Sequence, residues 1–183
     1  MTKIEIWNLA LGEIGSLGTI VNETDATPEA KHCVAAWNPA LDATLKCYPW
    51  ACARREATLA RRSDVKSIRW KFVYQLPADC LTVRETIPDR IKRELGRGQL
   101  LCDEEKMAIV YTARIKAEEL ASHVADAVVL KLAHHLTTAM RTGGSQLIQS
   151  LYQRYELALA EARRIEGHAA FDRPKVPRWR FCG

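Results

Sequence analysis

The segment from residue 118 to residue 141 constrains the fold most, because it predicts a helix with apolar side chains on nearly every side. A helix that is hydrophobic all round must be covered on more than one face. It therefore lies at the centre of a helical bundle or against a neighbouring subunit. Since the segment is too apolar for the surface of an isolated chain, we expect identical copies to cover it. The side chains expected to pack between subunits are Leu120, Val124, Val128, Leu132 and Leu136.

Three further helices are predicted beside this one. An apolar stripe at helical spacing over residues 4–14 predicts the first helix, and Gly15 ends it. Thr27-Pro28-Glu29 predicts the start of the second helix, with an N-cap, a proline at the first position and an acid in the first turn. Pro39 lies inside this helix and predicts a kink or a break. Ser145 is the expected N-cap of the last helix.

Between residues 69 and 115 the hydrophobic period changes to two, which predicts three to five antiparallel strands with one apolar and one solvated face. Helices precede and follow these strands. The predicted fold class is therefore α+β, an antiparallel helical bundle with an inserted small antiparallel β-sheet. The predicted bundle comprises residues 1–68 and 116–168, the β domain residues 69–115, and a C-terminal docking arm residues 169–183.

The net charge of +5 is concentrated in two places. Residues 54–71 contain seven basic and two acidic side chains, and residues 171–183 contain four basic side chains and one acidic. Two basic patches suit an anionic partner, either nucleic acid or an acidic protein surface. No stretch approaches the roughly 20 apolar residues of a transmembrane helix, and the first residues lack the features of a signal peptide. We expect neither a membrane protein nor a secreted one.

The C-terminal segment combines two prolines with two large aromatic side chains. It cannot form a helix interior, and it is too short to bury its own aromatic residues. One interpretation is a disordered tail. We favour an arm that becomes ordered on a partner, with the aromatic residues as anchors and the arginines as hydrogen-bond donors. The residues expected to dock are Arg173, Lys175, Arg178, Trp179, Arg180 and Phe181.

No group of residues forms a recognisable catalytic or metal-binding motif. The sequence has no Gly-x-Ser-x-Gly, no Cys-x-x-Cys and no glycine-rich phosphate loop after a strand. The best metal candidates are His123, His134 and His135 with Glu119, but the first two histidines would lie roughly 16 Å apart along a helix. We expect no metal, no cofactor and no enzymatic activity. The cysteines are expected to be mostly small buried hydrophobic residues in a reducing compartment.

Five separate blocks of sequence, spread over residues 4–166, follow one another in the order of a known protein family. They are residues 8–15, residues 48–55 with Leu59-Ala60, residues 70–83, residues 110–112, and residues 127–136 followed by Leu151, Tyr155, Leu159, Ala160 and Ala162. In this order they resemble the tail tubular protein A family, the head-to-tail adaptors of short-tailed bacteriophages. The most specific parts are Pro-Trp-x-x-Ala in the second block and Tyr-x-Leu-Pro-x-Asp-Cys-Leu in the third. Pro39 and residues 61–69 depart from the family's pattern.

The resemblance implies a structural virion protein assembled in the host cytoplasm. Such adaptors form a ring of twelve copies below the portal protein, and the ring's bore passes the genome. The ring also supports the tail nozzle protein and often tail fibres or spikes, and the C-terminal segment commonly reaches the portal. The expected contact with genomic DNA in the channel is passive.

The sequence leaves two alternatives open. One is a non-specific nucleic-acid-binding protein that uses the basic patches at 54–71 and 173–180. The other is a cell-wall hydrolase of phage entry, which needs one carboxylic acid in an apolar pocket near a second carboxylate. Glu118 and Glu119 are adjacent and so point to different sides of a helix, and residues 103–105 occupy an expected exposed turn. The hydrolase is therefore the weaker alternative.

Overall fold

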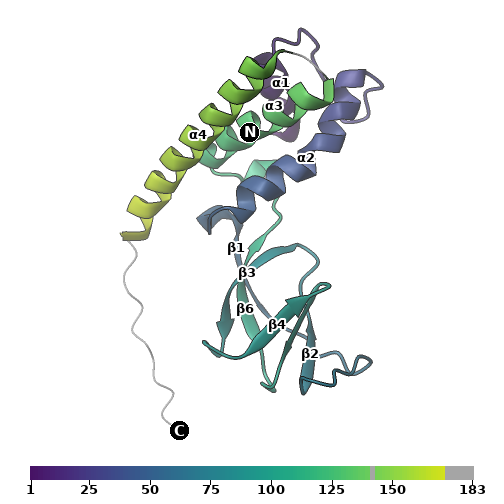
Figure 1. The fold of residues 1–183 in the computed structure, drawn as a ribbon, viewed down its shortest axis with the longest axis vertical. Helices are drawn as coiled ribbons and strands as arrows, with labels where there is room; N and C mark the ends of the chain where they lie inside the picture. Colours follow the sequence, from purple (N-terminus) through teal and green to yellow (C-terminus); the bar gives the residue numbers. More distant parts are fainter. Residues whose placement is uncertain (141–142, 172–183) are drawn as a thin grey trace.

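A computed structural model of the chain describes residues 1–140 and 143–171, with helices at one end and strands at the other (Figure 1). The helices are α1 (Lys3–Glu13), α2 (Pro28–Lys46), α3 (Ser122–Met140) and α4 (Ser145–Phe171), with short 3-10 turns η1 (Ala51–Ala53) and η2 (Ala117–Glu119). The strands are β1 (Arg54–Thr58), β2 (Phe72–Gln75), β3 (Cys80–Ile87), β4 (Arg93–Gly96), β5 (Gln99–Cys102) and β6 (Ala108–Ala113). Within the described ranges, every helix is too short or too polar to traverse a lipid bilayer.

The helix boundaries follow local signals in the sequence. Gly15 adopts a φ of 72°, a left-handed conformation that ends α1 where the glycine predicts it. At the start of α2, the Thr27 hydroxyl oxygen accepts a hydrogen bond from the backbone N–H of Ala30, which confirms the predicted N-cap. Pro39 lies within α2, and the helix continues through it. The break considered at Pro39 is therefore wrong.

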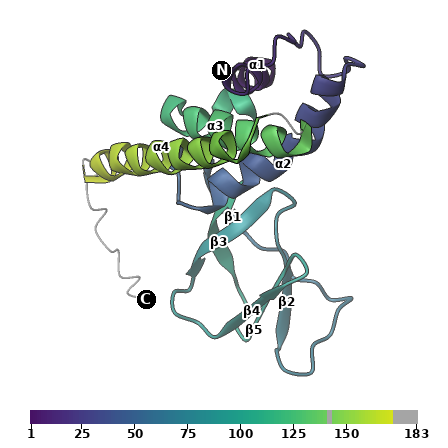
Figure 2. The ribbon, with the colours of Figure 1, turned by 45° about the horizontal axis from the view of Figure 1, so that its top comes forward.

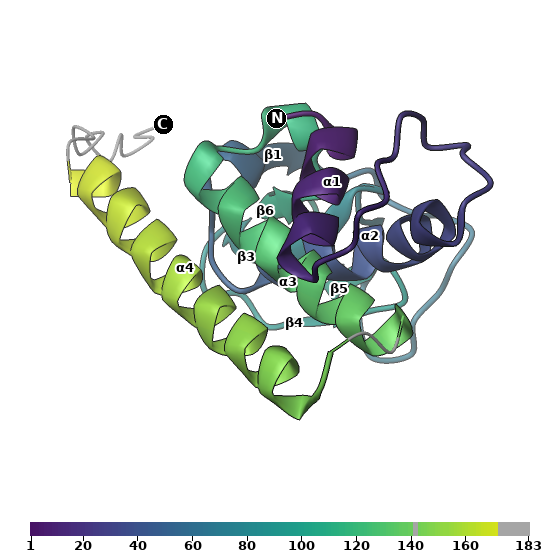
Figure 3. The same cartoon turned by 90° about the horizontal axis from the view of Figure 1, so that it is seen from above.

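Helix α3 is the centre of the helical part, and α1, α2 and α4 all pack against it (Figure 3). Its apolar faces are thus covered by the chain's own helices. Of the side chains expected to pack between subunits, Leu120 is 8% exposed, and Val124, Val128, Leu132 and Leu136 are each 0% exposed. This corrects the interpretation of the segment, because these residues have little or no exposed area to offer a neighbouring chain.

The predicted antiparallel helical bundle is also wrong, although the chain is α+β. The helices have unequal lengths, and three of them surround α3 rather than lying in a row of equivalent neighbours (Figures 1 and 3). The physical reason is the composition of α3. A helix that is apolar all round takes a partner on each face, whereas each bundle helix contributes one stripe to a shared core.

The strands form two antiparallel three-stranded sheets rather than one small sheet. The first sheet has the order β1-β6-β3, and the second has the order β2-β5-β4. A tight turn joins β4 to β5, with φ values of 51° at Arg97 and 72° at Gly98 that are typical of a type I′ hairpin. Strand β1 begins at Arg54, ahead of residue 69, where the predicted β domain starts.

The helical and β parts meet at the end of α2 (Figure 2). The guanidinium of Arg84, on β3, donates hydrogen bonds to the backbone carbonyls of Lys46 at 2.9 Å and Tyr48 at 3.1 Å. The last carbonyls of a helix lack partners within the helix, so a cation at this end is favourable. Arg114, which follows β6, forms an ion pair with Asp42 of α2. These contacts fix the β part against the helices.

Candidate functional site

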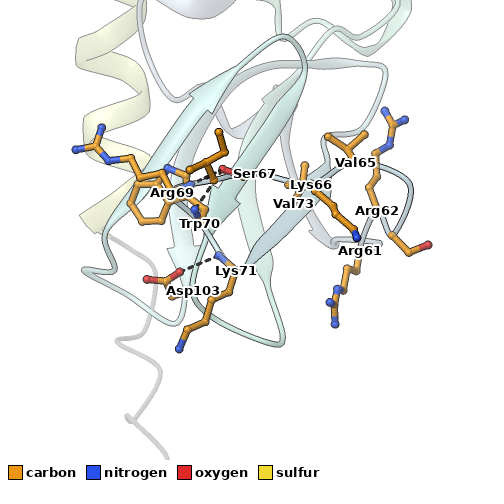
Figure 4. Close-up of a pocket in the computed structure, with 12 residues that line it drawn as sticks. Arg61, Arg62, Val65, Lys66, Ser67, Arg69, Trp70, Lys71, Val73 and Asp103 are labelled. Carbon is orange, nitrogen blue, oxygen red and sulfur yellow. Dashed lines mark hydrogen bonds between the residues drawn. The ribbon is translucent and has the colours of Figure 1, made fainter.

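A hollow of about 590 Å³ lies beneath the loop that joins β1 to β2, which we call the basic loop (residues 61–71) (Figure 4). The loop lies at the end of the β part that is farthest from the helices (Figures 1 and 2). The residues that line the hollow are Arg61, Arg62, Ser63, Val65, Lys66, Ser67, Ile68, Arg69, Trp70, Lys71, Val73 and Asp103.

The basic loop is anchored by backbone hydrogen bonds at its start and by a side-chain cap near its end. The backbone N–H of Arg62 donates to the carbonyl of Val73 at 2.8 Å, which holds the start of the loop against β2. The Ser67 hydroxyl oxygen accepts the backbone N–H groups of Arg69 and Trp70, both at 3.2 Å. A serine that caps the following backbone in this way forms a local turn. The loop therefore has a defined course around the hollow.

Most cations of the basic loop have no ion-pair partner in the part of the chain that the structure describes. Arg62 is paired with Asp64, and this hydrogen bond lowers the pKa of the Asp64 carboxyl. Arg61, Lys66, Arg69 and Lys71 form no ion pair with other residues that the structure describes. The remaining charges leave a positive surface around the hollow.

Two aromatic side chains, Trp70 and Phe72, lie next to these cations. The Arg61 guanidinium lies 4.3 Å from the centre of the Phe72 ring. The indole Nε1–H of Trp70 donates to the carboxylate of Glu94 at 2.9 Å, and the ring remains partly exposed. Asp103 contributes the one carboxylate of the lining, and its Oδ1 accepts the backbone N–H of Lys71 at 3.0 Å. The site thus combines cations, hydroxyls and planar surfaces with little negative charge.

The structure brings together only part of the basic patch predicted at residues 54–71. Five of its seven basic side chains lie on the basic loop, whereas Arg54 and Arg55 lie on β1. Arg55 forms an ion pair with Glu119 at 2.8 Å, in the connection to α3. The second patch, residues 173–180, and the expected docking residues Arg173, Lys175, Arg178, Trp179, Arg180 and Phe181 lie outside the described residues.

The histidines considered as metal ligands have separate surroundings. His123 Nε2 lies 3.2 Å from Glu166, and Glu119 is engaged by Arg55. His134 and His135 are adjacent on α3, and loss of hydration lowers the pKa of both imidazoles. Within residues 1–140 and 143–171 no three His, Cys, Asp or Glu side chains are close enough together to hold a metal ion.

A clamp at the end of α4 has no signal in the sequence. Glu166 accepts a hydrogen bond from the backbone N–H of Ala51 at 3.2 Å while its other oxygen lies beside His123. Glu166 thus joins α4 to η1, 115 residues earlier in the sequence, and to the start of α3, 43 residues earlier. A lone glutamate on an amphipathic helix does not reveal partners at such separations. We call this contact the Glu166 clamp.

Three side chains that could serve nucleophilic or acid catalysis, Cys33, Glu118 and Glu119, have surroundings that do not favour these roles. Cys33 is fully buried, and burial raises the pKa of its thiol to about 12, so it carries no thiolate at neutral pH. Glu118 and Glu119 are exposed rather than held in an apolar pocket. A raised carboxylic acid pKa of the kind a glycosidase needs comes from burial.

Apolar side chains remain exposed on the helical part after α3 has been covered. Leu9 of α1 is 50% exposed, and Tyr152 and Leu157 of α4 are 48% and 71% exposed. Leu9 borders a hollow of about 260 Å³ shared with Leu130 of α3 and the Glu13–Arg154 ion pair. We call Leu9, Tyr152 and Leu157 the outer apolar residues. Comparison with protein-family models and with curated protein sequences finds no match to this chain.

Proposed function

We propose that this chain is a structural virion protein, a ring-forming head-to-tail adaptor between a portal protein and a tail nozzle. In this role identical copies surround a channel through which the genome leaves. The resemblance implies twelve copies, and it adds tail fibres or spikes to the partners that such rings often support. The proposal includes no catalytic step.

The main support for this proposal is spatial. The second, third and fourth sequence blocks on which the resemblance is based lie next to one another in the fold. Pro49 and Trp50 of the second block border the same small cavity as Tyr111 and Thr112 of the fourth. The Tyr111 hydroxyl lies 3.3 Å from a carboxylate oxygen of Asp79, in the third block. Residues that are distant in the sequence thus form one junction between the helical and β parts. A shared junction gives a physical reason for these blocks to occur together.

The outer apolar residues supply a second line of support. Contiguous exposed apolar side chains are typical of contact sites, and Tyr152 and Leu157 border one shallow hollow on α4. Since the predicted subunit contacts on α3 are buried within the chain, any contact between copies must use other residues. Leu9, Tyr152 and Leu157 are the most exposed candidates on α1 and α4.

Electron microscopy of the protein mixed with portal rings of the same virus tests the proposal. We expect a second ring stacked coaxially on the portal, with its copies countable around the axis. The protein alone should be monomeric or weakly associated. Portal rings with free C-terminal ends that bind none of this protein would contradict the proposal.

Removal of residues 172–183 tests the docking arm separately. We expect the truncated chain to keep its helical circular dichroism, because α4 runs to Phe171. We also expect weaker attachment to portal rings, measured by co-sedimentation. Unchanged attachment would exclude the docking role of Arg173, Lys175, Arg178, Trp179, Arg180 and Phe181, and it would leave the ring itself unaffected.

A further inference from the structure

The charge of the basic loop requires an explanation that folding does not provide. Over residues 61–71 five basic side chains face one acidic side chain, Asp64, and Arg62 already uses it. Like charges gathered on one short loop repel one another, and an anion bound along the loop relieves this repulsion. The loop is therefore suited to a negatively charged ligand.

The distribution of these charges favours an extended ligand over a single ion. Arg61 and Lys71 extend in the same direction from opposite sides of the hollow, while Arg62 and Arg69 extend away at its two ends (Figure 4). Charges spread in this way around about 590 Å³ do not converge on one point. A polymer with regularly repeated charges meets several of them at once.

We propose that the basic loop binds the sugar–phosphate backbone of a nucleic acid, without reading its sequence. Guanidinium groups match phosphate oxygens with paired hydrogen bonds, and Arg69 is exposed and free of ion pairs with the described residues. The Ser67 oxygen accepts two backbone N–H groups, which leaves its own O–H to donate to a phosphate.

Planar side chains beside these cations favour a nucleic acid over an acidic polypeptide. Trp70 is partly exposed, and Arg61 is held against the Phe72 ring. Exposed aromatic rings and stacked arginines next to a basic groove bind bases as well as backbone in proteins that bind nucleic acid without sequence preference. The inference does not depend on the proposed function, because it concerns a single chain and can fail or hold whether or not the chain forms a ring.

Fluorescence polarisation of the full chain with a labelled DNA duplex of about 20 base pairs, and with one of its strands, tests the inference. The test variant is K66Q/R69Q/K71Q, which removes three exposed cations that have no ion pair with the described residues. The control variant is K31Q/K46Q/R163Q, which removes one arginine and two lysines exposed on α2 and α4. Both variants have the same net charge, and circular dichroism checks that both are folded.

We expect the wild-type chain to bind both the duplex and the single strand, with a Kd that rises steeply as salt increases from about 50 to 200 mM. Each phosphate contact contributes about 0.9 to the slope of log affinity against log salt, so the test variant should reduce the slope by about 2 to 3. Its affinity at low salt should fall at least tenfold, and that of the control less than about threefold.

Three results would overturn the inference. The first is equal loss in the two variants, because binding would then follow net charge or the C-terminal segment. The second is no binding to either DNA at low salt. The third is competition by poly-glutamate as effective as competition by unlabelled DNA at equal charge, because the loop would then be a site for acidic protein segments.

Discussion

Two neighbouring histidines on α3 are expected to make the protein sensitive to acid. Burial lowers the pKa of His134 and His135, and Lys131 lowers both further. Below about pH 6.5 the unfolded chain therefore binds protons that the folded chain does not, so the free energy of unfolding falls as pH falls. Replacement of His135 by Leu removes one of these groups. We expect a flatter dependence from about pH 7 to pH 5 in urea unfolding.

At higher pH the same variant should be at least as stable as the wild type. His135 Nε2 is buried and has no hydrogen-bond partner among the described residues, and such an atom costs about 1 kcal/mol or more. If the free energy of unfolding changes with pH in the same way for wild type and His135→Leu between about pH 7 and pH 5, then His135 stays hydrated in the folded protein.

Two tryptophans with hydrogen-bonded indoles should differ in their importance for stability. Trp50 is fully buried, and its Nε1–H donates to the carbonyl of Thr44 at 2.8 Å. Trp70 donates to Glu94 in an exposed setting. We expect Trp50→Phe to reduce the free energy of unfolding by about 2 kcal/mol, because it leaves a cavity and removes a buried hydrogen bond to the Thr44 carbonyl. Trp70→Phe should cost less than about 1 kcal/mol, and similar losses in urea titrations would contradict the assignment.

At the scale of secondary-structure elements, the Glu166 clamp is expected to hold the end of α4. Glu166→Ala leaves the N–H of Ala51 without its acceptor and should cost about 1–2 kcal/mol. Faster amide hydrogen exchange in the last turns of α4 should accompany this loss. Glu161→Ala is the matched control, since Glu161 pairs with Arg164 on the exposed face of the same helix. It should cost less than about 0.5 kcal/mol, and equal losses in both variants would refute the clamp.

The elements that the sequence predicts correctly are those specified by adjacent residues. Gly15 ends α1, and Thr27 with Pro28 begins α2, because capping involves only the nearest turn. Strand β1 is missed because its sequence is polar and its burial alternates weakly. It is a strand because Arg54–Thr58 pairs with β6, whose residues come 50 to 58 positions later in the chain. A pairing of this kind depends on the tertiary fold and not on local propensity.

For the same reason, the sequence gives the composition of the basic loop but not its shape. A run of basic residues usually forms a solvated surface. What makes this run a candidate site is the course of the loop, set by the cap at Ser67 and the bond between Lys71 and Asp103. The partner of Lys71 is 32 residues away, so the hollow could not be derived from the spacing of the charges.

At the scale of the whole molecule, the central question is which apolar residues belong to the core and which are left for other copies. Leu132 is 0% exposed and Leu157 is 71% exposed, although both are leucines on long helices. We expect Leu132→Ala to lower the free energy of unfolding by about 2–5 kcal/mol and Leu157→Ala by less than about 0.5 kcal/mol. Urea unfolding of the two variants measures this difference.

For assembly on portal rings, we expect the exposed Leu157 to matter more than the buried Leu132. Leu157→Glu places a charge on an exposed position of α4, so the chain should fold normally but add poorly to portal rings, as counted by electron microscopy. Exposed Lys46 on α2 offers a control, because Lys46→Glu changes charge without touching the outer apolar residues. If Leu157→Glu assembles as well as Lys46→Glu and the wild type, this face of α4 is free in the ring. Contact between copies would then have to be sought on the other exposed apolar side chains, of which Leu9 on α1 is the first to replace.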